Sequence, residues 1–89
     1  MRASDPYRVV QWVGDRVAER RHALGLTQEA LAERLEVSVK YLQRLEAGQE
    51  NLTIHSMVGL ANALAVSPNY LLQRPRAKRV RKPGRPRSK

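Results

Sequence analysis

The last sixteen residues, RPRAKRVRKPGRPRSK (residues 74–89), contain nine Lys or Arg and no acidic residue. A dense cluster of positive charges binds polyanions, either nucleic acid or an anionic membrane surface. The formal net charge of the chain is +9, and the tail holds the whole excess, because residues 1–73 contain eight basic and eight acidic side chains. The composition therefore predicts a near-neutral domain followed by a polycationic tail.

A second set of chemically capable side chains lies in the segment that begins at Ser38. At helical spacing Lys40, Gln43 and Arg44 lie opposite Leu42 and Leu45. The helical period therefore turns the polar side chains outwards and the leucines inwards. This segment presents an exposed surface of hydrogen-bond donors that a binding partner can reach.

Several other kinds of chemistry are excluded by composition. The chain has no Cys and two His, His22 and His55, which are far apart, so neither a disulfide framework nor a zinc site is expected. We find no glycine-rich phosphate loop, and we predict neither an enzyme nor a cofactor or small-molecule ligand. There is no apolar run long enough for a membrane span and no signal-peptide core, so a cytoplasmic protein is expected.

The elements that position these side chains are predicted to be helices, since no alternating β pattern and no Asn-Gly or Asp-Gly hairpin occurs. The first helix begins at Asp5 and Pro6, which suit an N-cap and a first helical position, and it ends at Gly25. Its expected apolar stripe is Val10, Val13, Val17 and Leu24.

Four shorter helices are predicted to follow, and a hydroxyl side chain opens each of them. Their expected N-caps are Thr27, Ser38, Thr53 and Ser67. Gly48 is expected to stop the helix that begins at Ser38. The side chains expected to face the core are Leu31, Leu35, Leu42, Leu45, Ile54, Met57, Leu60, Ala61 and Leu64.

The helices at 27–35 and 38–47 are separated only by Glu36 and Val37. A link this short makes two short helices cross steeply, and the small Ala32 allows close approach at the crossing. This arrangement is that of a helix-turn-helix, whose second helix enters the major groove of DNA.

The stretch LTQEALAERLEVSVKYLQRLEAGQENLT (residues 26–53) resembles the repressor-type helix-turn-helix domains of the phage lambda, 434 and Cro repressors and of the bacterial XRE regulators. The resemblance extends from Val13 to Leu72. It implies an all-α, five-helix domain that binds double-stranded DNA sequence-specifically as a transcription regulator, in a bacterial or phage setting and on the nucleoid. Since one helix reads few bases, a homodimer on a pseudo-palindromic site is expected.

The same resemblance assigns DNA contacts to individual positions. Arg44 is suited to a bidentate contact with guanine, and Tyr41 either binds phosphate or packs against the preceding helix. Arg21 and Glu46 match a structural pair of the family. The implied base contacts are Val39, Lys40, Gln43 and Arg44. The implied phosphate contacts are Gln28, Ser38, Tyr41, Gln49 and Asn51.

Two acidic residues depart from the family pattern. Glu36 occupies a turn position where Gly is common, and a left-handed backbone there would cost about 1 kcal/mol. Glu50 occupies a loop where many relatives have a basic residue, and its charge repels phosphate. We therefore expect this loop to hold DNA through its N–H groups, Gln49 or Asn51.

The end of the tail, KPGRPRSK, resembles an AT-hook, which inserts an Arg into the narrow minor groove of A·T-rich DNA. Pro83 stands where that motif has Arg, so a disordered arm that grips phosphates without sequence preference is the favoured alternative. A membrane role is not expected, because the tail has no Trp, Phe or Leu anchor. The tail residues expected at the groove or backbone are Arg79, Arg81, Lys82, Gly84, Arg85 and Arg87.

The chain is thus divided into an extension of the first helix (1–12), a DNA-binding domain (13–73) and a basic tail (74–89). The dimer surface is expected either at Tyr70 and Leu71 or at Tyr7, Val9 and Trp12. Two other interpretations remain open: an architectural DNA-binding protein dominated by its tail, and an antitoxin-like module that binds another protein.

Overall fold

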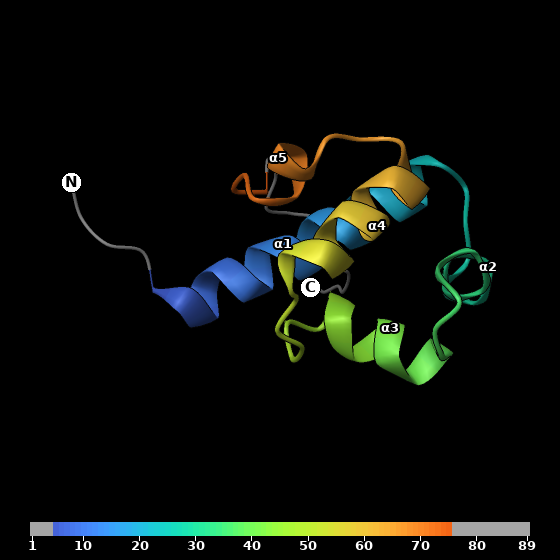
Figure 1. Cartoon of the computed structure of the whole chain (residues 1–89), viewed down its shortest axis with the longest axis horizontal. Helices are drawn as coiled ribbons and strands as arrows, with labels where there is room; N and C mark the ends of the chain where they lie inside the picture. Colours follow the sequence, from blue (N-terminus) through green and yellow to red (C-terminus); the bar gives the residue numbers. More distant parts are fainter. Residues whose placement is uncertain (1–4, 76–89) are drawn as a thin grey trace, which may run out of the picture.

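The computed structural model describes residues 5–75, which form five α-helices and no strand (Figure 1). The helices are α1 (Pro6–Ala23), α2 (Gln28–Leu35), α3 (Val39–Glu46), α4 (Ile54–Leu64) and α5 (Pro68–Leu71). The all-α, five-helix prediction is therefore confirmed. The helix-turn-helix pair is α2 and α3, which lie side by side in Figure 1.

The long helix α1 is the element on which the others assemble. It contacts α3, α4 and α5, while α2 packs against α3 and α4. The side chains at the centre of this packing are inaccessible to solvent or nearly so: Val17, Leu31, Leu42, Leu60, Leu64 and Leu71. Because the core takes residues from all five helices, it fixes the position of α3 relative to the rest of the domain.

Local signals in the sequence set most of the helix ends. Asp5 caps α1, and the hydroxyl oxygens of Thr27, Ser38 and Thr53 each accept a bond of 3.0 Å from an N–H three residues later. Ser67 occupies the predicted N-cap position of α5, but its side chain makes no capping hydrogen bond. Pro68 at the first position of α5 and the buried side chain of Leu71 stabilise this helix instead.

Two predicted core residues lie at the surface. Ile54 is 79% exposed, because it is the first residue of α4 and projects beyond the end of the core, which begins one turn later at Met57. Leu24 is 37% exposed, because it follows the last turn of α1, and Leu26 packs against the core instead.

A glycine sets the closest approach between α1 and α3. A Cβ atom added at Gly14 would lie 2.6 Å from the carbonyl oxygen of Leu45 and 2.7 Å from that of Glu46. No side chain larger than hydrogen fits there without displacing backbone. Gly14 therefore holds the carboxyl end of α3 directly against α1.

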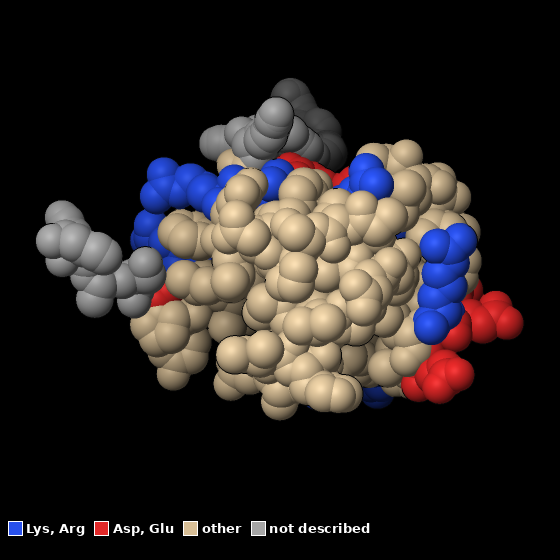
Figure 2. All heavy atoms as spheres, turned by 45° about the horizontal axis from the view of Figure 1, so that its top comes forward, with Lys and Arg blue, Asp and Glu red and all other residues tan. Residues whose placement is uncertain are grey.

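The surface over α4 and α5 is uncharged, since neither helix contains Lys, Arg, Asp or Glu. Figure 2 shows this face as a broad area of uncharged residues with charged side chains at its margin. Within it Ile54 and Val58, one helical turn apart, are 79% and 40% exposed. An apolar pair on an uncharged face is a candidate contact surface.

Candidate nucleic-acid interface

The turn between α2 and α3 contains a residue with a left-handed backbone, at the position where Gly is common in the similar domains. Glu36 has φ 60° and ψ 44°, and the N–H of the next residue, Val37, donates to the carbonyl of Ala32 at 3.0 Å. This hydrogen bond closes the end of α2 and sends the chain directly into α3. Ala32 itself is 2% exposed at the crossing of the two helices.

The outer face of α3 carries the predicted base-contacting side chains. Lys40, Gln43 and Arg44 are exposed, while Leu42 and Leu45 are buried at 0% and 3% exposure. Val39 is half-buried and packs against the core, so it offers only part of its side chain to a partner. The structure thus brings three polar side chains together on one exposed helical surface.

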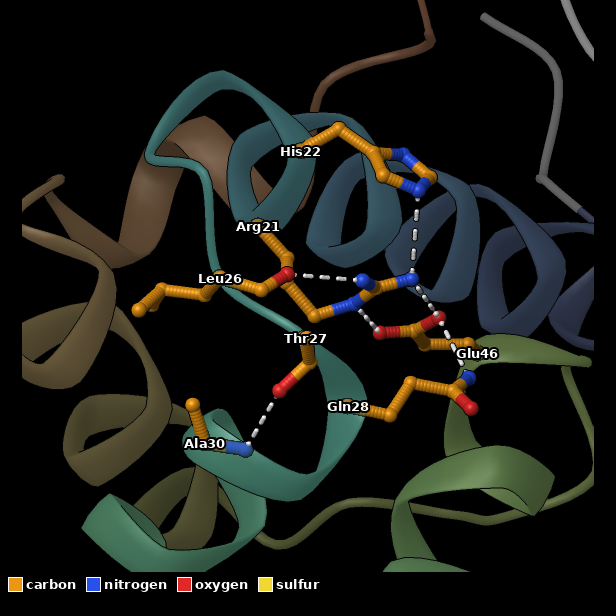
Figure 3. Close-up of polar contacts among 7 residues, drawn as sticks. All are labelled: Arg21, His22, Leu26, Thr27, Gln28, Ala30 and Glu46. Atoms are coloured by element: carbon orange, nitrogen blue, oxygen red, sulfur yellow. Dashed lines mark hydrogen bonds and ion pairs between the residues drawn. The ribbon is translucent and has the colours of Figure 1, made fainter.

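A buried ion pair holds α3 against α1. The Nε of Arg21 donates to Glu46 Oε2 at 2.6 Å and its NH2 donates to Glu46 Oε1 at 3.0 Å (Figure 3). Both side chains are less than a tenth exposed. The NH1 group of Arg21 also donates to the carbonyl of Leu26 at 2.9 Å, just before α2. A guanidinium fixed at several points has little rotational freedom, so this pair orients the helices.

Gln28 joins the same network from α2. Its Nε2 donates to Glu46 Oε1 at 3.0 Å, and Figure 3 shows the amide lying against the carboxylate. The side chain predicted to bind phosphate is therefore directed at Glu46 in the free protein. The backbone N–H groups of Gln28 and Glu29 precede the first intrahelical bond of α2, and such groups are available to an anion.

The remaining predicted phosphate contacts lie around the same surface. Ser38 Oγ accepts from the N–H of Tyr41 at 3.0 Å, and its own hydroxyl proton remains available as a donor. Tyr41 is half-buried and packs against the core, and contact of its hydroxyl group with phosphate stays a prediction. Gln49 and Asn51 are exposed in the loop after α3. The tail positions Arg79, Arg81, Lys82, Gly84, Arg85 and Arg87 lie outside the described residues.

Glu50 forms an ion pair with Arg44, which the sequence interpretation missed. The Arg44 NH2 group donates to Glu50 Oε2, and the two side chains are 51% and 16% exposed. Sequence reasoning treated Glu50 only as a repellent of phosphate. The signal available was the six-residue spacing across the Gly48 turn, which brings the loop back over the last turn of α3.

Arg16 is a second residue that sequence reasoning missed. It is 5% exposed, its Nε donates to the carbonyl of Tyr70 at 3.2 Å, and its NH2 donates to Gln73 Oε1 at 3.0 Å. Its guanidinium carbon also lies 3.9 Å from the centre of the Tyr70 ring. Arg16 therefore ties α5 and the residues after it to α1.

Within the described part of the chain, no group of three or more metal-ligating side chains is close enough to hold an ion. Across residues 5–75, every helix is too short or too polar to cross a lipid bilayer.

Comparison with known proteins gives matches over most of this domain. A family model described as helix-turn-helix matches residues 17–71. The chain is 43% identical over 58 residues to an uncharacterized transcriptional regulator in the ATPase CF(0) region of Rhodospirillum rubrum. That match covers 65% of this chain and 54% of the relative, so the chain spans about half of that protein's length.

Two further similarities agree with this match. An uncharacterized HTH-type transcriptional regulator, y4dJ, of Sinorhizobium fredii is 44% identical over 55 residues, which are 62% of this chain and 71% of that protein. The crystal structure of the restriction-modification controller protein C.AhdI from Aeromonas hydrophila superposes with a TM-score of 0.70 at 35% identity. The superposition covers 76% of this chain and 99% of the controller protein.

Proposed function

Because this chain belongs to the XRE-type helix-turn-helix family of DNA-binding transcriptional regulators, a class of proteins that are not enzymes, we propose that it regulates transcription by reading a specific duplex site through α3. The observation that carries the proposal is the exposed surface of Lys40, Gln43 and Arg44 on a helix that buried contacts hold rigidly. An α-helix fits the major groove, where each base pair presents a distinct set of donors and acceptors.

The proposed base contacts follow from the chemistry of these side chains. Arg44 donates two hydrogen bonds to guanine O6 and N7, Lys40 binds guanine or phosphate, and Gln43 binds adenine. Val39, half-buried at the start of α3, contacts a thymine methyl group with its exposed part. The Arg21–Glu46 pair makes no base contact and sets the angle at which α3 enters the groove.

The proposed phosphate contacts surround this helix. The free N–H groups at the start of α2 take one phosphate, with Gln28 rotating from Glu46 to join them. Ser38 and Tyr41 bind a second phosphate, and Gln49 and Asn51 bind a third from the loop after α3. The basic tail adds affinity without sequence preference, and Arg85 in the minor groove is the more specific version of that role.

We further propose that the protein binds its site as a homodimer, in the cytoplasm and on the nucleoid. The eight residues of α3 span few base pairs, and two copies related by a twofold axis double the length of DNA that is read. The exposed pair Ile54 and Val58 on α4 supplies the contact surface. Leu71, an alternative from the sequence, is fully buried in its own chain, whereas Tyr7 is 82% exposed and remains an alternative.

Oligomeric state tests the dimer surface. Light scattering of Ile54→Glu and Tyr7→Glu, each run over a range of concentrations, will show which substitution yields a monomer. A dimer that persists in Ile54→Glu and dissociates in Tyr7→Glu would place the contact on α1 instead.

Selection from random duplex DNA with the full chain tests the reading of a specific site. A recovered motif with twofold symmetry supports the proposal, and Arg44→Ala is then expected to weaken that site by about 1–3 kcal/mol and to relax one base position. Equal loss on the motif and on scrambled DNA would remove Arg44 from base reading. Recovery of no motif would favour an architectural protein or a protein-binding module.

A further inference from the structure

We propose that Glu50 is a specificity-determining positioning residue, which directs Arg44 to a base and away from the phosphate backbone; this inference rests on the proposed function of α3. An Arg on a DNA-facing helix is equally able to bind a phosphate, which carries no sequence information. A neighbouring carboxylate changes the balance between these two partners. Glu50 is the carboxylate that contacts Arg44.

The turn after α3 places this carboxylate. Gly48 has φ +77°, its N–H donates to the carbonyl of Leu45 at 3.1 Å, and the N–H of Gln49 donates to the carbonyl of Arg44 at 2.9 Å. These two bonds form a Schellman motif, which returns the chain alongside the last helical turn. Glu50 is the next residue, so the backbone itself directs it towards Arg44.

The close packing of Gly48 keeps this turn in place. A Cβ atom added at Gly48 would lie 2.7 Å from Cγ of Gln11, so the turn is held against α1. The Glu50 side chain is 16% exposed, whereas that of Arg44 is 51% exposed. The carboxylate is therefore the more buried partner of the pair, and the guanidinium is the more exposed one.

This geometry leaves Arg44 able to read a base. A guanidinium has five N–H donors, and the contact with Glu50 uses the NH2 group alone. The donors that remain suffice for the two acceptors of guanine. The contact with Glu50 also restricts the rotamers of Arg44 before binding, so less side-chain entropy is lost when Arg44 binds a base. The Arg44–Glu50 pair as a whole is neutral, so it gains little binding free energy from contact with a phosphate. Glu50 thus favours matched sites over unmatched DNA.

The test compares Glu50→Gln with Glu33→Gln, a control that removes the same charge from an exposed position on α2. The DNA probes are the duplex recovered by selection with the full chain and a scrambled duplex of equal length. Exposed ion pairs correspond to about 1.5- to 5-fold in an equilibrium constant. E50Q is expected to lower the ratio of the two affinities about threefold or more, by strengthening scrambled and weakening selected binding. E33Q is expected to leave that ratio unchanged.

The salt dependence provides a second measurement. On scrambled DNA the slope of log affinity against log salt should increase in magnitude by about 0.9 in E50Q, because Arg44, no longer paired with Glu50, binds one more phosphate. In an Arg44→Ala background, E50Q should change neither the slope nor the ratio. Melting curves of each variant establish that the fold is retained.

Three results would overturn the inference. One is an affinity ratio in E50Q that equals that of E33Q, which would make Glu50 an ordinary surface charge. Another is a loss of selected-site binding that persists in the Arg44→Ala background, which would make Glu50 itself a base contact. The third is an unchanged salt slope on scrambled DNA. A failure of the proposed function is distinct, since selection would then return no motif for any variant.

Discussion

Gly14 and Gly59 both lie inside helices, and substitution of each by Ala is expected to change stability in opposite directions. Alanine is favoured over glycine in a helix interior by about 1 kcal/mol. At Gly59, on α4, nothing lies within 4 Å of the added Cβ. Gly59→Ala should therefore stabilise the domain by about 0.5–1 kcal/mol and raise Tm by about 2–8 °C.

At Gly14 the same substitution meets the backbone of α3. The added carbon would lie 2.6 Å from the carbonyl oxygen of Leu45, whereas ordinary contacts begin at 3.4 Å, so the helices must separate by about 0.8 Å. Overpacking of this kind costs about 1–3 kcal/mol, which exceeds the gain in helix propensity. We expect a net loss of about 1–2 kcal/mol and a fall in Tm of about 4–16 °C.

Thermal and urea unfolding followed by circular dichroism will measure both variants, at two protein concentrations so that dimer formation is taken into account. DNA affinity should fall further in Gly14→Ala than stability alone explains, because the shift moves α3 relative to α2. If Gly14→Ala raises Tm as much as Gly59→Ala does, α1 and α3 are not packed as closely as described, and the reasoning fails.

Three further predictions concern the core, the buried ion pair and the tail. Leu45→Ala, at a site 3% exposed, should lower the free energy of unfolding by about 2–5 kcal/mol, while its neighbour Arg44→Ala leaves the melting curve nearly unchanged. Glu46→Ala should cost about 3–5 kcal/mol, because it leaves Arg21 buried without its carboxylate, and Arg21→Met/Glu46→Leu should recover much of that loss in urea titrations. A chain truncated after Pro75 keeps the Arg16–Gln73 contact and Arg74, whose guanidinium carbon lies 5.2 Å from the centre of the Trp12 ring. If half of the basic side chains that the truncation removes engage phosphates, the slope of log affinity against log salt on random DNA should decrease in magnitude by about 4. A change in the order of preference among specific sites would show that the tail reads sequence.

Local chemistry in the sequence was sufficient to predict the five helices and the outward face of α3. Thr27, Ser38 and Thr53 act as N-caps because their hydroxyls bond to an N–H within the same helix. Such features depend on neighbours a few residues away, which a sequence displays directly.

The family resemblance added what local chemistry does not contain. The Arg21–Glu46 pair joins residues twenty-five positions apart, and only the resemblance to the family predicted it. Gln28, assigned to phosphate by the same resemblance, is turned to Glu46 in the free protein. A motif therefore does not fix which partner a side chain contacts in the structure.

Tertiary packing decided the environments of Ile54 and Arg16, and it holds in place the local turn that carries Glu50. The helical period places Ile54 on the inner face, but the core ends one turn short of it. Arg16 is buried because a carbonyl from α5, a glutamine amide and an aromatic ring meet its guanidinium, and none of these is near it in sequence. Glu50 reaches Arg44 through the local turn at Gly48, and the packing of that turn against α1 keeps it in place. Each outcome depends on where a second element lies, and that position is fixed by the packing of the whole core.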